Sequence, residues 1–139
     1  CVAYKSNSEF ARAGGVGGGL PSNVTDPASS TWTTDDIMSI ALDVDNEAVY
    51  FAKNGTWEVN SDPESGASKT GAVTLPNSNS TYFFAFAVYG SPGTGQANFG
   101  NPPYANSSDA ADADGYGAFE YAPPSGYYAL NTKNLAEYG

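Results

Sequence analysis

Large apolar side chains alternate with smaller or more polar ones in the stretch from Ile37 to Val44. A period of two is the signature of a β-strand, because successive side chains of a strand point to opposite faces of the sheet. We therefore predict a strand whose larger face lies in a hydrophobic core, with Leu42 buried. The residues of this larger face are Met38, Ile40, Leu42 and Val44.

Turn-forming residues follow this strand at 45–47, and a second apolar, β-prone run begins at Ala48. The run contains Phe51, which we also expect to be buried. Asn54 and Gly55 come after it, and this pair strongly favours a tight turn because both residues tolerate a positive φ. The pattern predicts a β-hairpin that leads into a second turn.

The most apolar stretch of the chain, 81–89, has apolar side chains on both faces of the strand that it predicts. Such a strand is typical of the middle of a sheet, where both faces are covered. Shorter strands are predicted at 72–75 and 96–100, whereas the polar and turn-rich segment 58–71 predicts a long exposed loop. Together these elements indicate an all-β fold with long connections.

Three segments carry motifs in a recognisable order: Ile37–Trp57, Tyr82–Tyr104 and Tyr121–Leu135. The first has Leu-Asp-x-Asp-Asn between two strands and ends in Phe-x-Lys-Asn-Gly. The second ends in Asn-Phe-Gly, followed by proline and an aromatic residue. These two resemble consecutive parts of SPRY domains, which belong to the concanavalin A-like β-sandwiches. The third is similar to the segment that closes SPRY-like modules in bacteriophage and other viral structural proteins.

The resemblance implies an antiparallel β-sandwich, the SPRY jelly roll, formed by residues 1–139 as a single domain with 122–139 as the closing segment. The strands that usually open a SPRY domain have no counterpart here, so we expect the chain to be the later part of such a domain in a longer protein. A variant that completes its sandwich in another way is the alternative. Cys1 would then be an internal strand residue, and a lipid-bearing N-terminal cysteine is the alternative. Cys1 is the single cysteine of the chain, and this excludes an intrachain disulfide.

The chain is strongly acidic, with five Lys or Arg against fifteen Asp or Glu and a formal net charge of −10. Such a surface repels nucleic acid and anionic membranes, whose binding depends on basic side chains. No run approaches the roughly twenty apolar residues that span a bilayer, so we expect no membrane insertion. A chain poor in Lys and Arg and rich in Ser, Thr, Asn and Gly is typical of an extracellular or virion location.

Carboxylates are the remaining candidates for catalysis, because the chain contains no histidine and therefore no Ser-His-Asp triad. Asp43, Asp45 and Glu47 lie at alternate positions, and paired carboxylates hydrolyse glycosides. Asp and Asn also stabilise turns through hydrogen bonds to the backbone, and this interpretation accounts for the three residues fully. We expect no catalytic residue and no enzyme activity.

A second acidic segment offers a candidate metal site. Asp109, Asp112 and Asp114 precede Gly115 in a segment of small residues, where carboxylate oxygens could converge on calcium. A solvated acidic loop is the alternative. Calcium at these residues is the one cofactor that the sequence suggests.

The resemblance implies that partners bind to loops at one edge of the sandwich, where aromatic side chains suit sugars or protein surfaces. We expect a non-enzymatic structural or adhesive module of a virion, in a tail fibre or a capsid decoration. Its partners would be other virion proteins or a host-surface glycan or protein, and the chain would form a homo-oligomer or part of a larger assembly. A carbohydrate-active enzyme of the same architecture and a SPRY adaptor that binds a peptide are the alternatives. The candidate binding residues are Trp32, which could instead plug the core, Trp57, Tyr104 and Tyr116.

Overall fold

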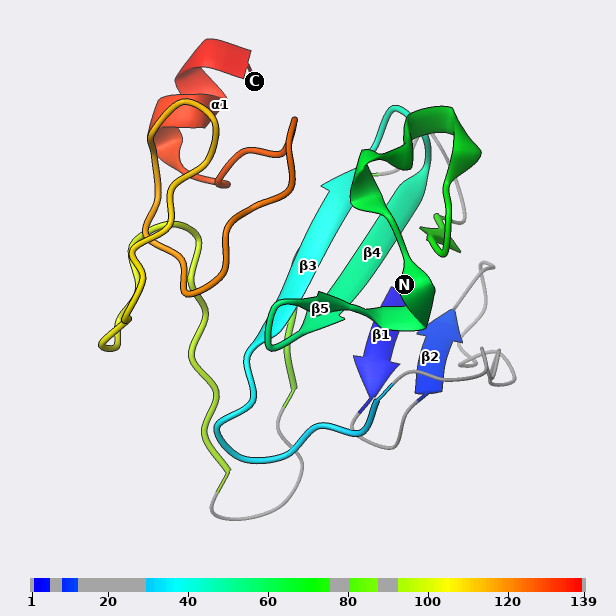
Figure 1. Cartoon of the computed structure of the whole chain (residues 1–139), viewed down its shortest axis with the longest axis horizontal. Coiled ribbons are helices and arrows are strands. Elements are labelled where there is room, and N and C mark those ends of the chain that lie inside the picture. The colour runs from blue at the N-terminus through cyan, green and yellow to red at the C-terminus, as the bar shows by residue number, and fades with distance from the viewer. Residues whose placement is uncertain (1, 6–8, 13–29, 76–80, 88–92, 139) are drawn as a thin grey trace. The chain divides into compact units, whose positions relative to one another are not determined.

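The computed structural model describes residues 2–5, 9–12, 30–75, 81–87 and 93–138 (Figure 1). The chain divides into two compact units, Cys1–Asn79 (unit 1) and Ser80–Gly139 (unit 2). Cys1 lies outside the described residues, as does the end of the strand predicted at 81–89.

Unit 1 is built around an antiparallel sheet in which β4 is the central strand. β3 pairs with β4 along its whole length, while β5 and β6 share the opposite edge of β4. β1 and β2 form a separate antiparallel hairpin. The elements are β1 (Val2–Lys5), β2 (Glu9–Arg12), β3 (Met38–Asp43), β4 (Ala48–Lys53), β5 (Thr56–Trp57), the 3-10 helices η1 (Glu58–Asn60) and η2 (Pro63–Ser68), and β6 (Val73–Thr74).

The two turns predicted around β4 are confirmed, with the side-chain chemistry that the sequence indicated. Asp43 accepts hydrogen bonds from the backbone nitrogen of Asn46 at 2.9 Å and from its side-chain amide at 2.8 Å. Asn54 and Gly55 adopt φ values of 48° and 79° between β4 and β5. The Asn54 side chain also accepts a hydrogen bond from the Ile37 backbone, so it anchors the start of β3.

Burial of the sheet differs from the prediction on one strand. Phe51 is 6% exposed, as expected, and every residue of β4 except Lys53 is buried. On β3, however, Ile40 is 43% exposed and Leu42 is only half-buried, while the small Ala41 is buried. β3 is an edge strand of this sheet, and the alternation of large and small residues does not by itself say which face is covered.

The polar segment predicted as an exposed loop at 58–71 instead forms η1 and η2. Glu58 is only 7% exposed. Its carboxylate accepts hydrogen bonds from the Tyr4 hydroxyl at 3.1 Å and from the Ser30 backbone at 2.8 Å. The Tyr4 ring packs edge-on against Phe51, with centroids 5.8 Å apart. A buried carboxylate therefore ties β1 and the start of the 30–36 segment to the sheet.

Unit 2 has little regular structure. Its described residues, 81–87 and 93–138, form an isolated antiparallel bridge between Ala110 and Phe119, with reciprocal hydrogen bonds of 2.8 Å, and α1 (Thr132–Tyr138). The central strand predicted at 81–89 is wrong for its described part, because residues 81–87 form no strand and are mostly exposed. The short strand predicted at 96–100 is also absent. A strand needs a partner, and the local sequence pattern does not supply one.

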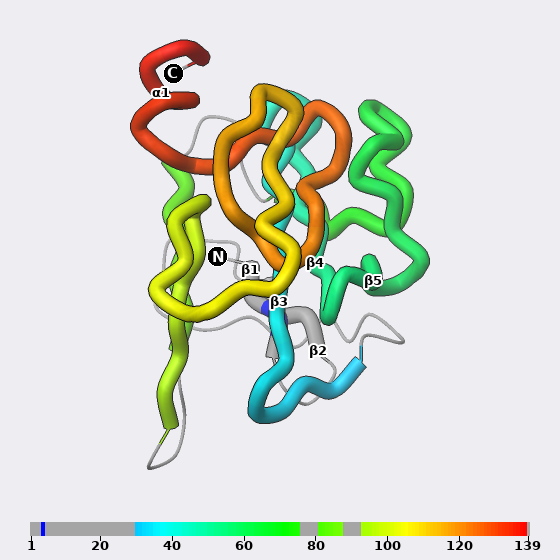
Figure 2. Tube along the Cα trace, turned by 60° about the vertical axis from the view of Figure 1, so that its left-hand side comes forward, coloured from blue at the N-terminus to red at the C-terminus, as the bar shows by residue number. Residues whose placement is uncertain are grey.

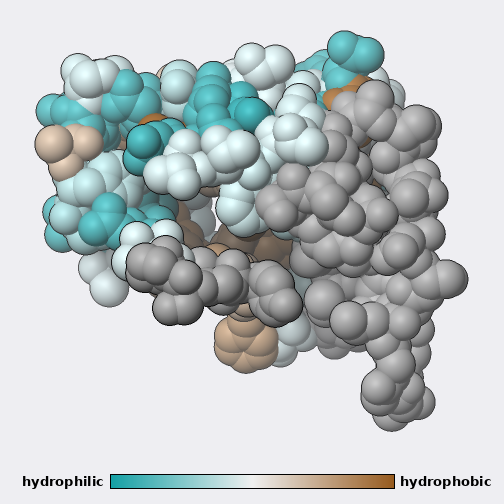
Figure 3. All heavy atoms as spheres, turned by 90° about the horizontal axis from the view of Figure 1, so that it is seen from below, coloured by the Kyte–Doolittle hydropathy of each residue, from teal (hydrophilic) through white to brown (hydrophobic). Residues whose placement is uncertain are grey.

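The described residues thus form a mostly-β structure with an antiparallel sheet and little helix. Among them, no helix is long and apolar enough to cross a membrane. Hydrophilic residues cover much of the described surface on the face drawn in Figure 3, in keeping with the acidic and polar composition.

Candidate functional site

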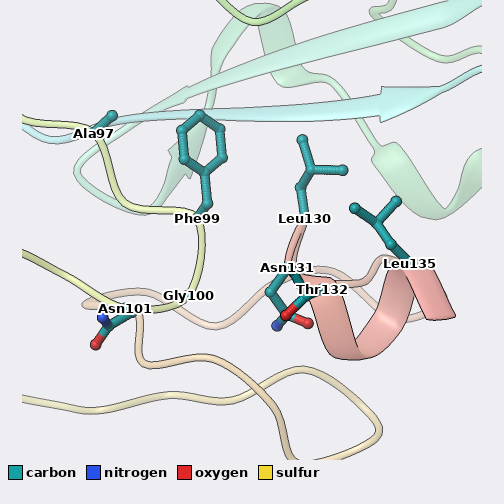
Figure 4. A pocket seen from close by; sticks show the side chains of 8 residues that line it. All are labelled: Ala97, Phe99, Gly100, Asn101, Leu130, Asn131, Thr132 and Leu135. Atoms are coloured by element: carbon teal, nitrogen blue, oxygen red, sulfur yellow. The ribbon is translucent and has the colours of Figure 1, made fainter. Parts of the chain in front are cut away.

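A groove of about 520 Å³ lies in unit 2, at the beginning of α1 (Figure 4). This volume falls within the range of small-molecule sites. Two segments far apart in the sequence form its walls, one at 97–101 and the other at 130–135. The lining residues are Ala97, Phe99, Gly100, Asn101, Leu130, Asn131, Thr132 and Leu135.

The groove has an apolar side and a polar side. In Figure 4, Phe99, Leu130 and Leu135 project in the same direction, whereas the amides of Asn101 and Asn131 point away from them. The three apolar side chains are between 45% and 52% exposed. None of the eight lining residues is ionisable, so the surface that the groove presents is uncharged.

Glycines bring the first wall of the groove against the bridged loop of unit 2. The Gly100 carbonyl accepts a hydrogen bond from the Ala118 backbone at 3.0 Å, and a Cβ added to Gly100 would lie 3.1 Å from the Cα of Gly117. The Asn98 amide donates to the Ala118 carbonyl at 2.8 Å, and its oxygen accepts from Gly100. This close backbone approach fixes the position of Phe99, whose ring contacts Phe84 at a centroid distance of 6.0 Å.

The second wall is fixed by the cap of α1. The Asn131 side-chain oxygen accepts hydrogen bonds from the backbone nitrogens of Lys133 and Asn134, at 3.0 and 2.9 Å. This is the preferred arrangement for an asparagine at a helix N-terminus. The cap orients the first turn of α1 so that Thr132 and Leu135 line the groove.

Asp112 joins the second wall to the bridged loop. It is 8% exposed, and its carboxylate accepts four hydrogen bonds of 2.8–3.1 Å. The donors are the backbone nitrogens of Asp114, Tyr116 and Ala129 and the side-chain amide of Asn134. Burial raises the pKa of Asp112, but these hydrogen bonds together lower the pKa below its usual value.

Three tyrosines and a lysine form a cluster around α1. The Lys133 ammonium lies 5.2 Å from the centroid of the Tyr116 ring, which is a cation–π geometry. Tyr128 and Tyr138 stack with centroids 4.6 Å apart. The Tyr138 hydroxyl donates to Asp114 at 2.6 Å, and this bond raises the pKa of Tyr138. Tyr116, one of the candidate binding residues, is therefore engaged within its own unit.

The two tryptophans proposed for binding belong to unit 1. The segment that carries Trp32 is held to β4 by Lys53, which donates to the Thr31 carbonyl at 2.6 Å and pairs with Asp36 at 3.1 Å. Trp32 is half-buried, and its indole nitrogen is buried with no hydrogen-bond partner among the described residues. Trp57 lies in β5 and is half-buried. This environment favours packing over sugar stacking for Trp32.

The remaining candidate residues are dispersed. Tyr104 is half-buried in a bend of unit 2 and does not line the groove. Asp109 is exposed, Asp112 is occupied by its four donors, and Asp114 binds Tyr138. Among the described residues, no three acidic or cysteine side chains gather closely enough to hold a metal ion. The structure therefore does not bring the proposed calcium ligands together.

The sequence interpretation missed the groove because its residues come from separate segments. Phe99 belongs to the Asn-Phe-Gly motif, and Leu130 and Leu135 belong to the apolar tail. The signal that could have found it is the asparagine cap at Asn131, which predicts a helix start immediately after Leu130.

No protein-family model, no curated protein and no solved structure matches the chain. The resemblance to SPRY domains stays a prediction from the motifs.

Proposed function

We propose that this chain is a non-enzymatic structural and adhesive module, of the type that virions carry on tail fibres or capsids, and that unit 2 binds a neutral glycan. For the complete domain we propose the antiparallel β-sandwich that the SPRY-like motifs imply. The observation that carries the binding proposal is the lining of the groove. An aromatic ring and two leucines stand beside neutral amide and hydroxyl groups, without any ionisable side chain.

Sugars combine an apolar C–H face with many hydroxyl groups, and this combination matches the groove. The partly exposed Phe99 ring can contact the C–H face of a pyranose ring on the apolar side of the groove, and Asn101 and Thr132 supply neutral hydrogen-bonding groups on its polar side. Glycoside hydrolysis needs two carboxyl groups at the bond that is broken, and the groove lining has none. The geometry therefore supports binding rather than catalysis at this site.

The charge of the chain narrows the class of glycan. A net charge of −10 repels sialylated or sulfated sugars. We therefore expect neutral hexoses, and a virion or extracellular setting in which such sugars are met on a host surface.

A glycan array with the purified full chain tests the proposal. We expect hits among neutral glycans and a loss of affinity of about tenfold in Phe99→Ala, since a contact worth about 1.4 kcal/mol changes affinity tenfold. Tyr121→Ala is the matched control, because Tyr121 is exposed but does not line the groove. Near-UV circular dichroism of each variant checks that the fold is intact.

Three results would contradict the proposal. Binding to acidic glycans alone would refute the neutral class, and equal losses in the two variants would refute the groove. Release of reducing sugar from a bound glycan, lost on replacing a carboxylate, would favour the enzyme alternative. Purified particles that contain the protein at a copy number matching fibre or capsid symmetry would support the virion setting.

A further inference from the structure

The segment Phe83–Ala87 is uncharged, apolar and exposed. No Asp, Glu, Lys or Arg occurs between Lys69 and Asp109, and Phe83–Ala87 lies within this neutral stretch. Phe83 is 86% exposed and Phe86 is 64% exposed. Exposed phenylalanines this close together are unusual on a protein surface without a partner.

Within the described part of the chain, the backbone of this segment is also unpaired. No backbone hydrogen bond joins residues 83–87 to another described residue, and the segment follows an extended course (Figure 2). An extended apolar stretch with free amide and carbonyl groups is a template for pairing with another strand. Its sequence, Phe-Phe-Ala-Phe-Ala, favours β-structure and contains neither proline nor glycine.

We propose that Phe83–Ala87 pairs with the same segment of a second copy of this chain, as an antiparallel two-stranded interface. Charge favours a second copy over a basic partner as the occupant. Two copies with a net charge of −10 repel each other wherever carboxylates meet, whereas this neutral stretch brings no like charges together. A basic foreign partner would be drawn to the acidic segments instead.

A two-fold axis at Ala85 gives a register that opposes Phe84 and Phe86 on one face of the pair, while Phe83 lies opposite Ala87 on the other face. Ala85 then lies opposite its own counterpart, and Phe84 lies opposite Phe86 of the second copy, twice by symmetry. Directly opposed aromatic residues stabilise antiparallel pairs. Phe84 already contacts Phe99 within its own unit, so the interface would continue an existing aromatic contact.

Sedimentation velocity over a range of concentrations tests this interface in the full chain. We expect a concentration-dependent dimer for the native sequence and a more than tenfold weaker dimer for Phe86→Lys. Tyr121→Lys is the control, since it places the same charge on an exposed aromatic position outside the neutral stretch. A monomer at every concentration, aggregates without a defined size, or equal effects of the two variants would overturn the proposal.

Cross-linking tests the register. In a Cys1→Ser background, Ala85→Cys should form an intermolecular disulfide under mild oxidation, because opposed residues of antiparallel strands have Cα atoms within disulfide range. Ala105→Cys is also exposed but lies outside the interface, so we expect it to remain reduced. Equal cross-linking at the two positions would contradict the proposed pairing.

Discussion

Replacing Asp112 is expected to loosen unit 2 substantially. The carboxylate is 8% exposed and holds four N–H groups from three separate segments. Two of these groups, the Ala129 backbone and the Asn134 amide, are themselves buried. In Asp112→Ala, both of these donors lose the carboxylate as their acceptor.

The expected cost follows from the number of buried donors left unpaired. Each unsatisfied buried donor costs about 1–3 kcal/mol, so two predict a loss of about 2–6 kcal/mol in the free energy of unfolding. Asp112→Asn should cost less, because its single oxygen still accepts hydrogen bonds on one side. Its NH₂ group, however, meets other N–H groups on the other side and cannot accept from them.

Native-state hydrogen exchange measures this loss within unit 2. The amides of Phe119 and Ala129, which donate to Ala110 and to Asp112, are the reporters. Asp109→Asn is the control, since Asp109 is exposed with a φ of 49° and asparagine tolerates this backbone conformation. If Asp112→Ala changed the exchange of these two amides no more than Asp109→Asn does, the role given to Asp112 would be wrong.

The same carboxylate makes unit 2 sensitive to acid. The pKa of Asp112 is lower in the folded chain than the value of about 3.9 in an unfolded one. Its stabilising contribution is therefore fully present above pH 4 and is lost as the pH falls through the lowered folded-state pKa. The protection of the Ala129 amide should fall over this range in the native chain, and this acid-dependent fall should be smaller in Asp112→Asn.

The remaining predictions concern unit 1 and are read from chemical denaturation followed by tryptophan fluorescence. Gly71→Ala should destabilise unit 1 strongly, because a Cβ at this position would lie 2.6 Å from the Cα of Ser61. Gly66→Ala is the control, since Gly66 also has a positive φ but a Cβ there would have nothing within 4 Å. Equal losses in the free energy of unfolding would contradict this packing. Phe51→Ala should lower the free energy of unfolding by about 3–5 kcal/mol, because it removes a buried aromatic side chain. Leu42→Ala should cost clearly less, because Leu42 is only half-buried, and the reverse order would refute the observed faces of the sheet.

The hairpin could be predicted because its signals are local. The turn at 45–47 and the Asn54-Gly55 pair act through the residues beside them, and both turns form as expected. The burial of Phe51 also followed from its place in a continuous apolar run. Turn chemistry and apolar runs of this kind need no knowledge of the rest of the chain.

The features that failed depend on distant partners. The face of β3 that is covered depends on what packs there, and Ile40 and Ala41 exchange the roles that their sizes suggested. Residues 81–87 have the composition of a central strand but no partner strand among the described residues. The candidate site is likewise non-local, because Phe99 and Leu135 line one groove only when the Gly100–Ala118 hydrogen bond and the cap of α1 hold the two walls in place.

An NMR titration of the full chain with a neutral oligosaccharide tests the central claim most directly. The account predicts that amide shift changes concentrate at 97–101 and 130–135, the two walls of the groove, and that Phe99→Ala reduces them strongly at the same sugar concentration. Shift changes confined to other segments, with these two unmoved, would contradict the proposed site. No shift change with any neutral glycan would contradict the proposed function.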